Sequence, residues 1–105
     1  KLNQQIRLLD QQIATNPRDG VSLLERGAFW AHRPDWDRAE RDFSEALECG
    51  FLVALHFRAF VREKMKRYRE ALEDATRFLR ESPDSRAKAE AAALKAELEK
   101  RVKPE

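Results

Sequence analysis

Apolar residues recur at helical spacing along most of this sequence, in runs of about a dozen residues that each end at a turn former. Asn16-Pro17, Pro34-Asp35, Gly50 and Ser82-Pro83 interrupt the pattern. Strand-type alternation of Val, Ile and Thr appears nowhere, so the pattern predicts an all-α fold. Six helices are expected: about 2–15, 20–32, 52–65, 68–81 and 86–101, and one between Asp35 and Gly50.

The composition of the chain excludes several classes of protein. The chain has 105 residues, of which 38% are charged and 42% hydrophobic, which excludes a disordered tail and fits one small, well-solvated helical domain. The net charge of +2, from 21 basic and 19 acidic side chains, does not call for nucleic acid or a membrane as partner. No apolar run approaches the roughly 20 residues that span a bilayer.

The single cysteine, Cys49, excludes an internal disulfide, which permits a reducing compartment. We therefore expect a cytoplasmic protein. The sequence starts at Lys1 with neither an initiator methionine nor a signal peptide, and is expected to be part of a longer or processed protein.

Two neighbouring segments share one residue pattern. The first reads Leu23-x-x-Arg26-Gly27-x-x-Trp30, then Trp36-x-x-Ala39-x-x-x-Phe43-x-x-Ala46-Leu47. The second reads Leu55-x-x-Arg58-Ala59, then Tyr68-x-x-Ala71-x-x-x-Ala75-x-x-Phe78-Leu79-x-x-x-Pro83. Small residues stand where two helices of a pair would approach closely, and an aromatic stands at each hairpin corner. Over residues 20–85 the pattern resembles the tetratricopeptide repeat (TPR) family.

The resemblance implies a right-handed α-α superhelix in which residues 1–105 form a single domain. Residues 2–15 would be the second helix of a partial repeat, 20–51 and 52–85 two repeats, and 86–102 a capping helix. The offset of 32 residues from Ala39 to Ala71 is shorter than the family's 34, and Phe51 stands where a proline is expected.

Arg26 and Asp42 lie 16 residues apart, as do Arg58 and Asp74, at equivalent positions of the two repeats. One interpretation is a substrate-binding arginine. The other, which we favour, is a partly buried ion pair between the helices of each hairpin, because repetition at equivalent positions suits a scaffold better than a single active site.

Other chemically active side chains give no enzyme signature. His32, His56 and Cys49 lack metal-ligand spacing; we expect surface or groove histidines and a buried cysteine. No phosphate-binding glycine loop or nucleophile set is present. We therefore expect no catalytic, cofactor-binding or metal site. The basic stretch Arg62–Arg69 is interpreted as a solvated turn, with phosphate contact as the alternative.

In such a stack the first helix of each repeat lines a concave face. The resemblance places there the expected partner-binding residues Val21, Leu24, Ala28, Val53, His56 and Phe60. Relatives that bind the carboxylates of chaperone tails carry lysine and asparagine in these positions, whereas this chain has Leu24, Ala28 and Phe57, so no such tail is expected to bind.

The sequence thus favours a protein-interaction scaffold that receives a peptide or helix in an apolar groove. The alternative is a structural segment of a longer solenoid with no peptide ligand of its own; nucleic-acid contact through the basic turn ranks third. Gln5 and Gln12 replace small residues on the first helix, so we expect either that a longer parent chain supplies the helix that packs there or that this N-terminal edge associates with another molecule.

Overall fold

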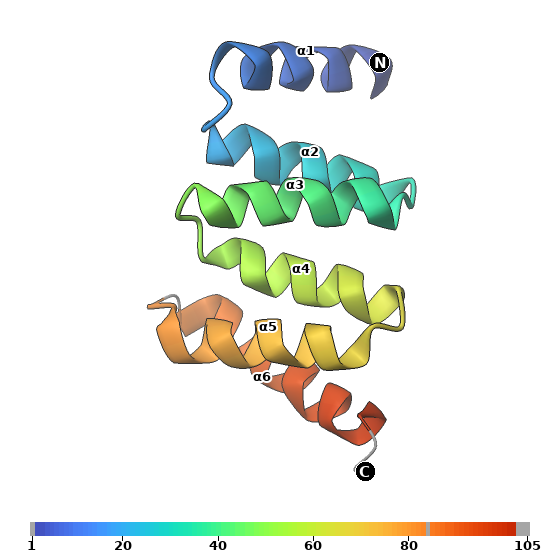
Figure 1. The fold of residues 1–105 in the computed structure, drawn as a ribbon, viewed down its shortest axis with the longest axis vertical. Coiled ribbons are helices and arrows are strands. Elements are labelled where there is room, and N and C mark those ends of the chain that lie inside the picture. Colours follow the sequence, from blue (N-terminus) through green and yellow to red (C-terminus); the bar gives the residue numbers. More distant parts are fainter. Residues whose placement is uncertain (1, 84, 103–105) are drawn as a thin grey trace. The chain divides into compact units, whose positions relative to one another are not determined.

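The computed structural model describes residues 2–83 and 85–102, and these residues form six α-helices and no strand (Figure 1). The helices are α1 (Leu2–Thr15), α2 (Gly20–His32), α3 (Trp36–Glu48), α4 (Val53–Lys64), α5 (Tyr68–Glu81) and α6 (Ser85–Arg101). The all-α prediction and the six helices are confirmed over this part of the chain. The predicted domain also includes residues 1, 84 and 103–105, which lie outside the described residues, as does the side chain of Leu2.

Local signals explain where these helices begin and end. The side chain of Asp19 accepts a hydrogen bond from the backbone N–H of Ser22 at 3.1 Å, and Asp35 accepts one from Arg38 at 3.2 Å. Each satisfies a backbone donor that the first turn of a helix leaves unpaired. After α3, Gly50 takes a φ of 95°, a left-handed conformation that favours glycine at a helix end.

The chain divides into two compact units, Lys1–Phe51 and Leu52–Glu105. In the first, α2 and α3 pack as a helical hairpin, and α1 lies against α2. The core of the hairpin is formed by fully or almost fully buried apolar side chains, among them Leu23, Ala39, Phe43 and Ala46.

Gly27 sets how closely α2 and α3 approach. A Cβ atom at this position would lie 2.6 Å from Cε1 of Phe43, closer than carbon atoms can pack. The glycine therefore makes room for the phenylalanine ring.

The second unit packs α4 against α5 and covers both with α6. Its core joins Ala59 of α4, Ala71 and Ala75 of α5, and Leu98 of α6, all with no exposed surface. Ala59 has the place in this hairpin that Gly27 has in the first, and Ala75 has the place of Phe43. The first hairpin thus pairs a glycine with a large ring, whereas the second pairs two alanines. Phe78, one turn after Ala75, supplies the volume that the second pair lacks.

We expect Gly27→Ala to lower the free energy of unfolding by about 1–2 kcal/mol, because overpacking costs about 1–3 kcal/mol while alanine regains part of this through helix propensity. Denaturant titration measures the change. Phe43→Leu in the same chain should recover part of the loss, since the shorter side chain leaves space for the added methyl group. An alanine variant as stable as the parent would show that this close approach does not require glycine.

Candidate protein-binding site

Arg26 joins all three helices of the first unit. Its Nε and Nη2 atoms donate to the two carboxylate oxygens of Asp42 in α3, both at 2.8 Å, and its Nη1 donates to Asp10 in α1 at 2.9 Å. Only 3% of the Asp42 side chain and 21% of the Arg26 side chain are exposed. The hydrogen bond to Asp42 is the main reason that the pKa of Arg26 is raised. The predicted ion pair is confirmed.

Asp74 holds two arginines in the second unit. Arg58 donates from Nε and Nη2 to its two carboxylate oxygens at 2.8 Å, which confirms the second predicted pair. Arg62, one turn further along α4, donates from Nη1 to the same carboxylate at 3.0 Å. Sequence reasoning had placed Arg62 in the basic turn; the signal that it missed is the four-residue spacing from Arg58, which puts both arginines on one face of the helix.

The basic turn is therefore less available to phosphate than its sequence implies. Arg62 points to Asp74, and Arg67 donates from Nε and Nη2 to Glu70. That hydrogen bond holds the pKa of Glu70 below its usual value. Two of the cations around this turn are thus already engaged with carboxylates of the same unit.

On α2, the three expected partner-binding residues follow one face of the helix at spacings of three and four residues. Val21 is 56% exposed. Ala28 is also exposed, and Leu24 is half-buried between them. The structure thus gives the first unit an apolar strip that solvent reaches.

On α4, the three expected partner-binding residues differ in how much of each side chain is exposed to solvent. Phe60 is 45% exposed, and the ammonium group of Lys64 lies 5.2 Å from its ring centroid. Val53 is half-buried. Phe57 is not one of the six expected partner-binding residues, although it stands where the chaperone-tail-binding relatives carry a polar residue, and it is 40% exposed. The second unit therefore also presents apolar surface from its first helix.

His56 is directed mainly into the second unit. Its ring stacks on Phe78 of α5 with centroids 5.6 Å apart, and its Nε2 lies 3.5 Å from a carboxylate oxygen of Glu90 in α6. Only 14% of the side chain is exposed, and its Nδ1 is buried without a hydrogen-bond partner among the described residues. His32 is the exposed histidine, so the expectation of surface histidines holds for one of the two.

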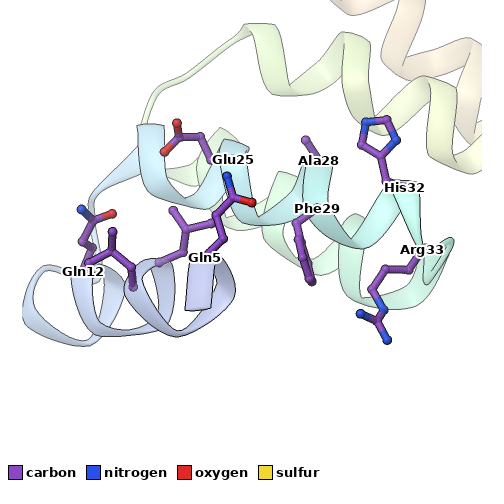
Figure 2. A pocket seen from close by; sticks show the side chains of 9 residues that line it. Gln5, Gln12, Glu25, Ala28, Phe29, His32 and Arg33 are labelled. Atoms are coloured by element: carbon purple, nitrogen blue, oxygen red, sulfur yellow. The ribbon is translucent and has the colours of Figure 1, made fainter. Parts of the chain in front are cut away.

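A pocket of about 690 Å³ lies between α1 and α2 (Figure 2). Figure 2 shows Ala28 and His32 on one side of α2, with Phe29 and Arg33 pointing to the other. The guanidinium of Arg33 lies 5.7 Å from the ring centroid of Phe29. The pocket is lined by Gln5, Leu8, Leu9, Gln12, Glu25, Ala28, Phe29, His32 and Arg33. Sequence reasoning had marked Gln5 and Gln12 but had missed Leu8, whose side chain is 55% exposed.

Neither the models of known protein families nor the curated proteins include one that matches this sequence. Over the described residues, no group of three or more His, Cys, Asp or Glu side chains is placed to hold a metal ion. None of the helices in this part of the chain combines the length and the apolar character needed to cross a membrane.

Proposed function

We propose that this chain is a non-enzymatic protein-interaction module built as a TPR-like superhelix of helical hairpins. A partner peptide or helix binds to apolar residues on the first helix of a hairpin: Val21, Leu24 and Ala28 of α2 in the first unit, and Val53, His56 and Phe60 of α4 in the second. Support comes from the two hairpins themselves, each with a bidentate arginine–aspartate pair between its helices at the same spacing.

The observation that carries this proposal is where large apolar side chains remain in solvent. Among the described residues, four large hydrophobic side chains are exposed, namely Leu8, Val21, Phe57 and Phe60. Three of them belong to α2 and α4, and none to α3 or α5. Phe57 and Phe60 lie three residues apart on the same helix, and contiguous exposed apolar surface usually marks an interaction site.

Phe60 is the strongest anchor for a partner. A rigid aromatic ring contributes a large contact area and loses little conformational entropy when it becomes buried. Lys64, next to the ring, adds a charge that an acidic side chain of the partner can pair with. His56 offers a partner little surface, because only 14% of its side chain is exposed and its ring stacks on Phe78.

Two other functions remain as competitors of the proposal. A structural segment of a longer solenoid would have its α2 and α4 faces covered by its own chain and would bind no peptide. Nucleic-acid binding through the basic turn is disfavoured by the carboxylates that engage Arg62 and Arg67. Salt titration separates nucleic-acid binding from peptide binding, because affinity that depends on phosphate contacts falls steeply with salt concentration.

The test is a peptide selected from a random display library on the parent protein, with its affinity then measured by calorimetry. We expect Phe60→Ala to weaken a peptide that binds α4, and Leu24→Ala one that binds α2, about tenfold or more, a loss of about 1.4 kcal/mol. Phe60→Ala should change the free energy of unfolding by less than about 1 kcal/mol, since the ring is already exposed.

Leu8→Ala is the matched control, because it removes an exposed leucine that lies outside these faces. Unchanged affinity in a folded Phe60→Ala, Leu24→Ala double variant would show that the faces of α2 and α4 are not the binding site. A selected peptide that loses affinity only in the Leu8→Ala variant would instead have bound at the pocket between α1 and α2.

A further inference from the structure

The exposed phenylalanines of α4 lie between two charges of opposite sign. Phe57 and Phe60 are 40% and 45% exposed. The Nζ atom of Lys64 lies 5.2 Å from the ring centroid of Phe60, one turn further along the helix. On the other side, the ring centroids of His56 and Phe57 are 5.8 Å apart, and Nε2 of His56 is 3.5 Å from a carboxylate oxygen of Glu90 in α6. The exposed apolar surface thus has a cation at one end and an acid at the other.

Helix geometry places the α4 residues of this surface on one side of the helix. At about 3.6 residues per turn, the four residues fall within about 100° of the helix circumference. We call this surface, with the acid beside it, the α4 strip; it consists of His56, Phe57, Phe60, Lys64 and Glu90. The step from His56 to Lys64 advances about 12 Å along the helix axis, so the acid and the cation lie about that far apart along the strip.

The charge at the Lys64 end of the strip is positive. Lys64 and Lys66 are both exposed. Arg62 and Arg67 pair with carboxylates of the same unit, so they change the local charge little. Glu63, the acid in the last turn of α4, is half-buried. An acidic group of a ligand therefore meets two exposed cations here and one partly covered carboxylate.

The charge at the other end of the strip is carried by a solvent-exposed carboxylate. The Glu90 side chain is 76% exposed, whereas the His56 side chain next to it is only 14% exposed. Arg86 stands one turn before Glu90 on α6, yet most of the Glu90 side chain stays in solvent. A basic group of a ligand can therefore reach this carboxylate.

We propose that the partner segment bound by the α4 strip carries a basic residue and an acidic residue on either side of its apolar residues. Its basic residue lies at Glu90 and its acidic residue at Lys64. This inference rests on the proposed function and specifies the ligand of the second unit. An extended segment advances about 3.3 Å per residue, so its two charges are about four residues apart, whereas those of a helical segment are about seven or eight residues apart.

The exposure of these charges favours a separate partner protein over another part of this chain. Where helices of this chain cover one another, the pairing acids are shut away from solvent, since only 3% of the Asp42 side chain and 6% of the Asp74 side chain are exposed. The α4 strip instead has an apolar centre and a solvent-accessible charged rim, as interfaces between separately folded proteins do. It also lies well inside the sequence, and α5 and α6, which pack against α4, leave it uncovered.

The test starts from display-selected peptides whose affinity for the parent protein falls in the Phe60→Ala variant, because these peptides bind the α4 strip. Calorimetry then measures their affinity for the Lys64→Glu and Glu90→Lys variants. We expect each charge reversal to weaken binding about fivefold or more, because it turns an attraction into a repulsion. Replacing the acidic residue of the peptide with lysine should restore its affinity for Lys64→Glu.

Two matched controls make the same changes in net charge on other helices of the second unit. Lys100→Glu in α6 and Glu73→Lys in α5 both alter exposed residues outside the strip. Each should leave the affinity of the selected peptides unchanged. Circular dichroism verifies that every variant is folded, and Glu90→Gln, which removes the charge without reversing it, should weaken binding less than Glu90→Lys.

The outcomes separate this inference from the proposed function. If the peptides depend on Phe60 but bind both charge-reversed variants as tightly as the parent, the strip binds peptides without selecting their charges, and only this inference is wrong. If no selected peptide depends on Phe60, α4 is not a peptide-binding site and both proposals fail for the second unit. If the parent self-associates in sedimentation and Phe60→Ala makes it monomeric, a second copy covers the strip and the inference is wrong.

Discussion

Replacing Asp74 with alanine is expected to lower the free energy of unfolding of the second unit by about 3–5 kcal/mol. Asp74 accepts hydrogen bonds from both Arg58 and Arg62, and each of these arginine side chains is only 15% exposed. Without the carboxylate, two guanidinium groups stay inside the hairpin with their main anionic partner removed. Because an arginine cannot lose its proton near neutral pH, the hairpin must open or hydrate to relieve the charge.

Glu73→Ala is the matched control for this substitution. Glu73 is the neighbouring acid on α5, is exposed and has no ion-pair partner among the described residues. Its loss should change stability by less than about 0.5 kcal/mol. Circular dichroism should follow the unfolding, since both tryptophans, Trp30 and Trp36, lie in the first unit and their fluorescence reports that unit alone. An Asp74→Ala protein that unfolds at the parent's denaturant concentration would show that the three-residue cluster contributes nothing to stability.

The sequence predicts the helices and the two ion pairs well because both depend on local spacing. Proline, glycine and capping aspartates mark the helix ends regardless of what packs on them, as Asp19 and Asp35 show. The pairs of Arg26 and Arg58 could be predicted because equal spacing in two hairpins of the same pattern brings the same side chains together. Because the same spacing occurs in both hairpins, it predicts a specific contact that a single occurrence would indicate only weakly.

The features that sequence reasoning missed depend on which way a side chain turns in three dimensions. His56 lies between expected contact residues, yet its ring turns inward because Phe78 offers it a flat apolar surface. Arg62 turns to Asp74 instead of joining the charged turn. Leu8 has the spacing of a core residue but is exposed, because no described helix covers that face of α1. Helical periodicity places a residue on a face but does not say whether anything packs against it.

Phe78 is a fully buried residue of α5. Replacing it tests how much the stability of the second unit depends on its ring. The ring has no exposed surface and supports the ring of His56, which in turn reaches Glu90 of α6. We expect Phe78→Ala to lower the free energy of unfolding by about 3–5 kcal/mol, because the change removes buried apolar area and leaves a cavity.

Phe78→Leu should cost less, since leucine refills most of that space, and the exposed Phe60→Ala provides the control for loss of a phenylalanine from the same unit. The order expected in denaturant titrations followed by circular dichroism is therefore Phe60→Ala closest to the parent, then Phe78→Leu, then Phe78→Ala. If Phe78→Ala were no less stable than Phe60→Ala, the ring of Phe78 would not be the centre of this core. The contact between His56 and that ring would then contribute little to the stability of the second unit.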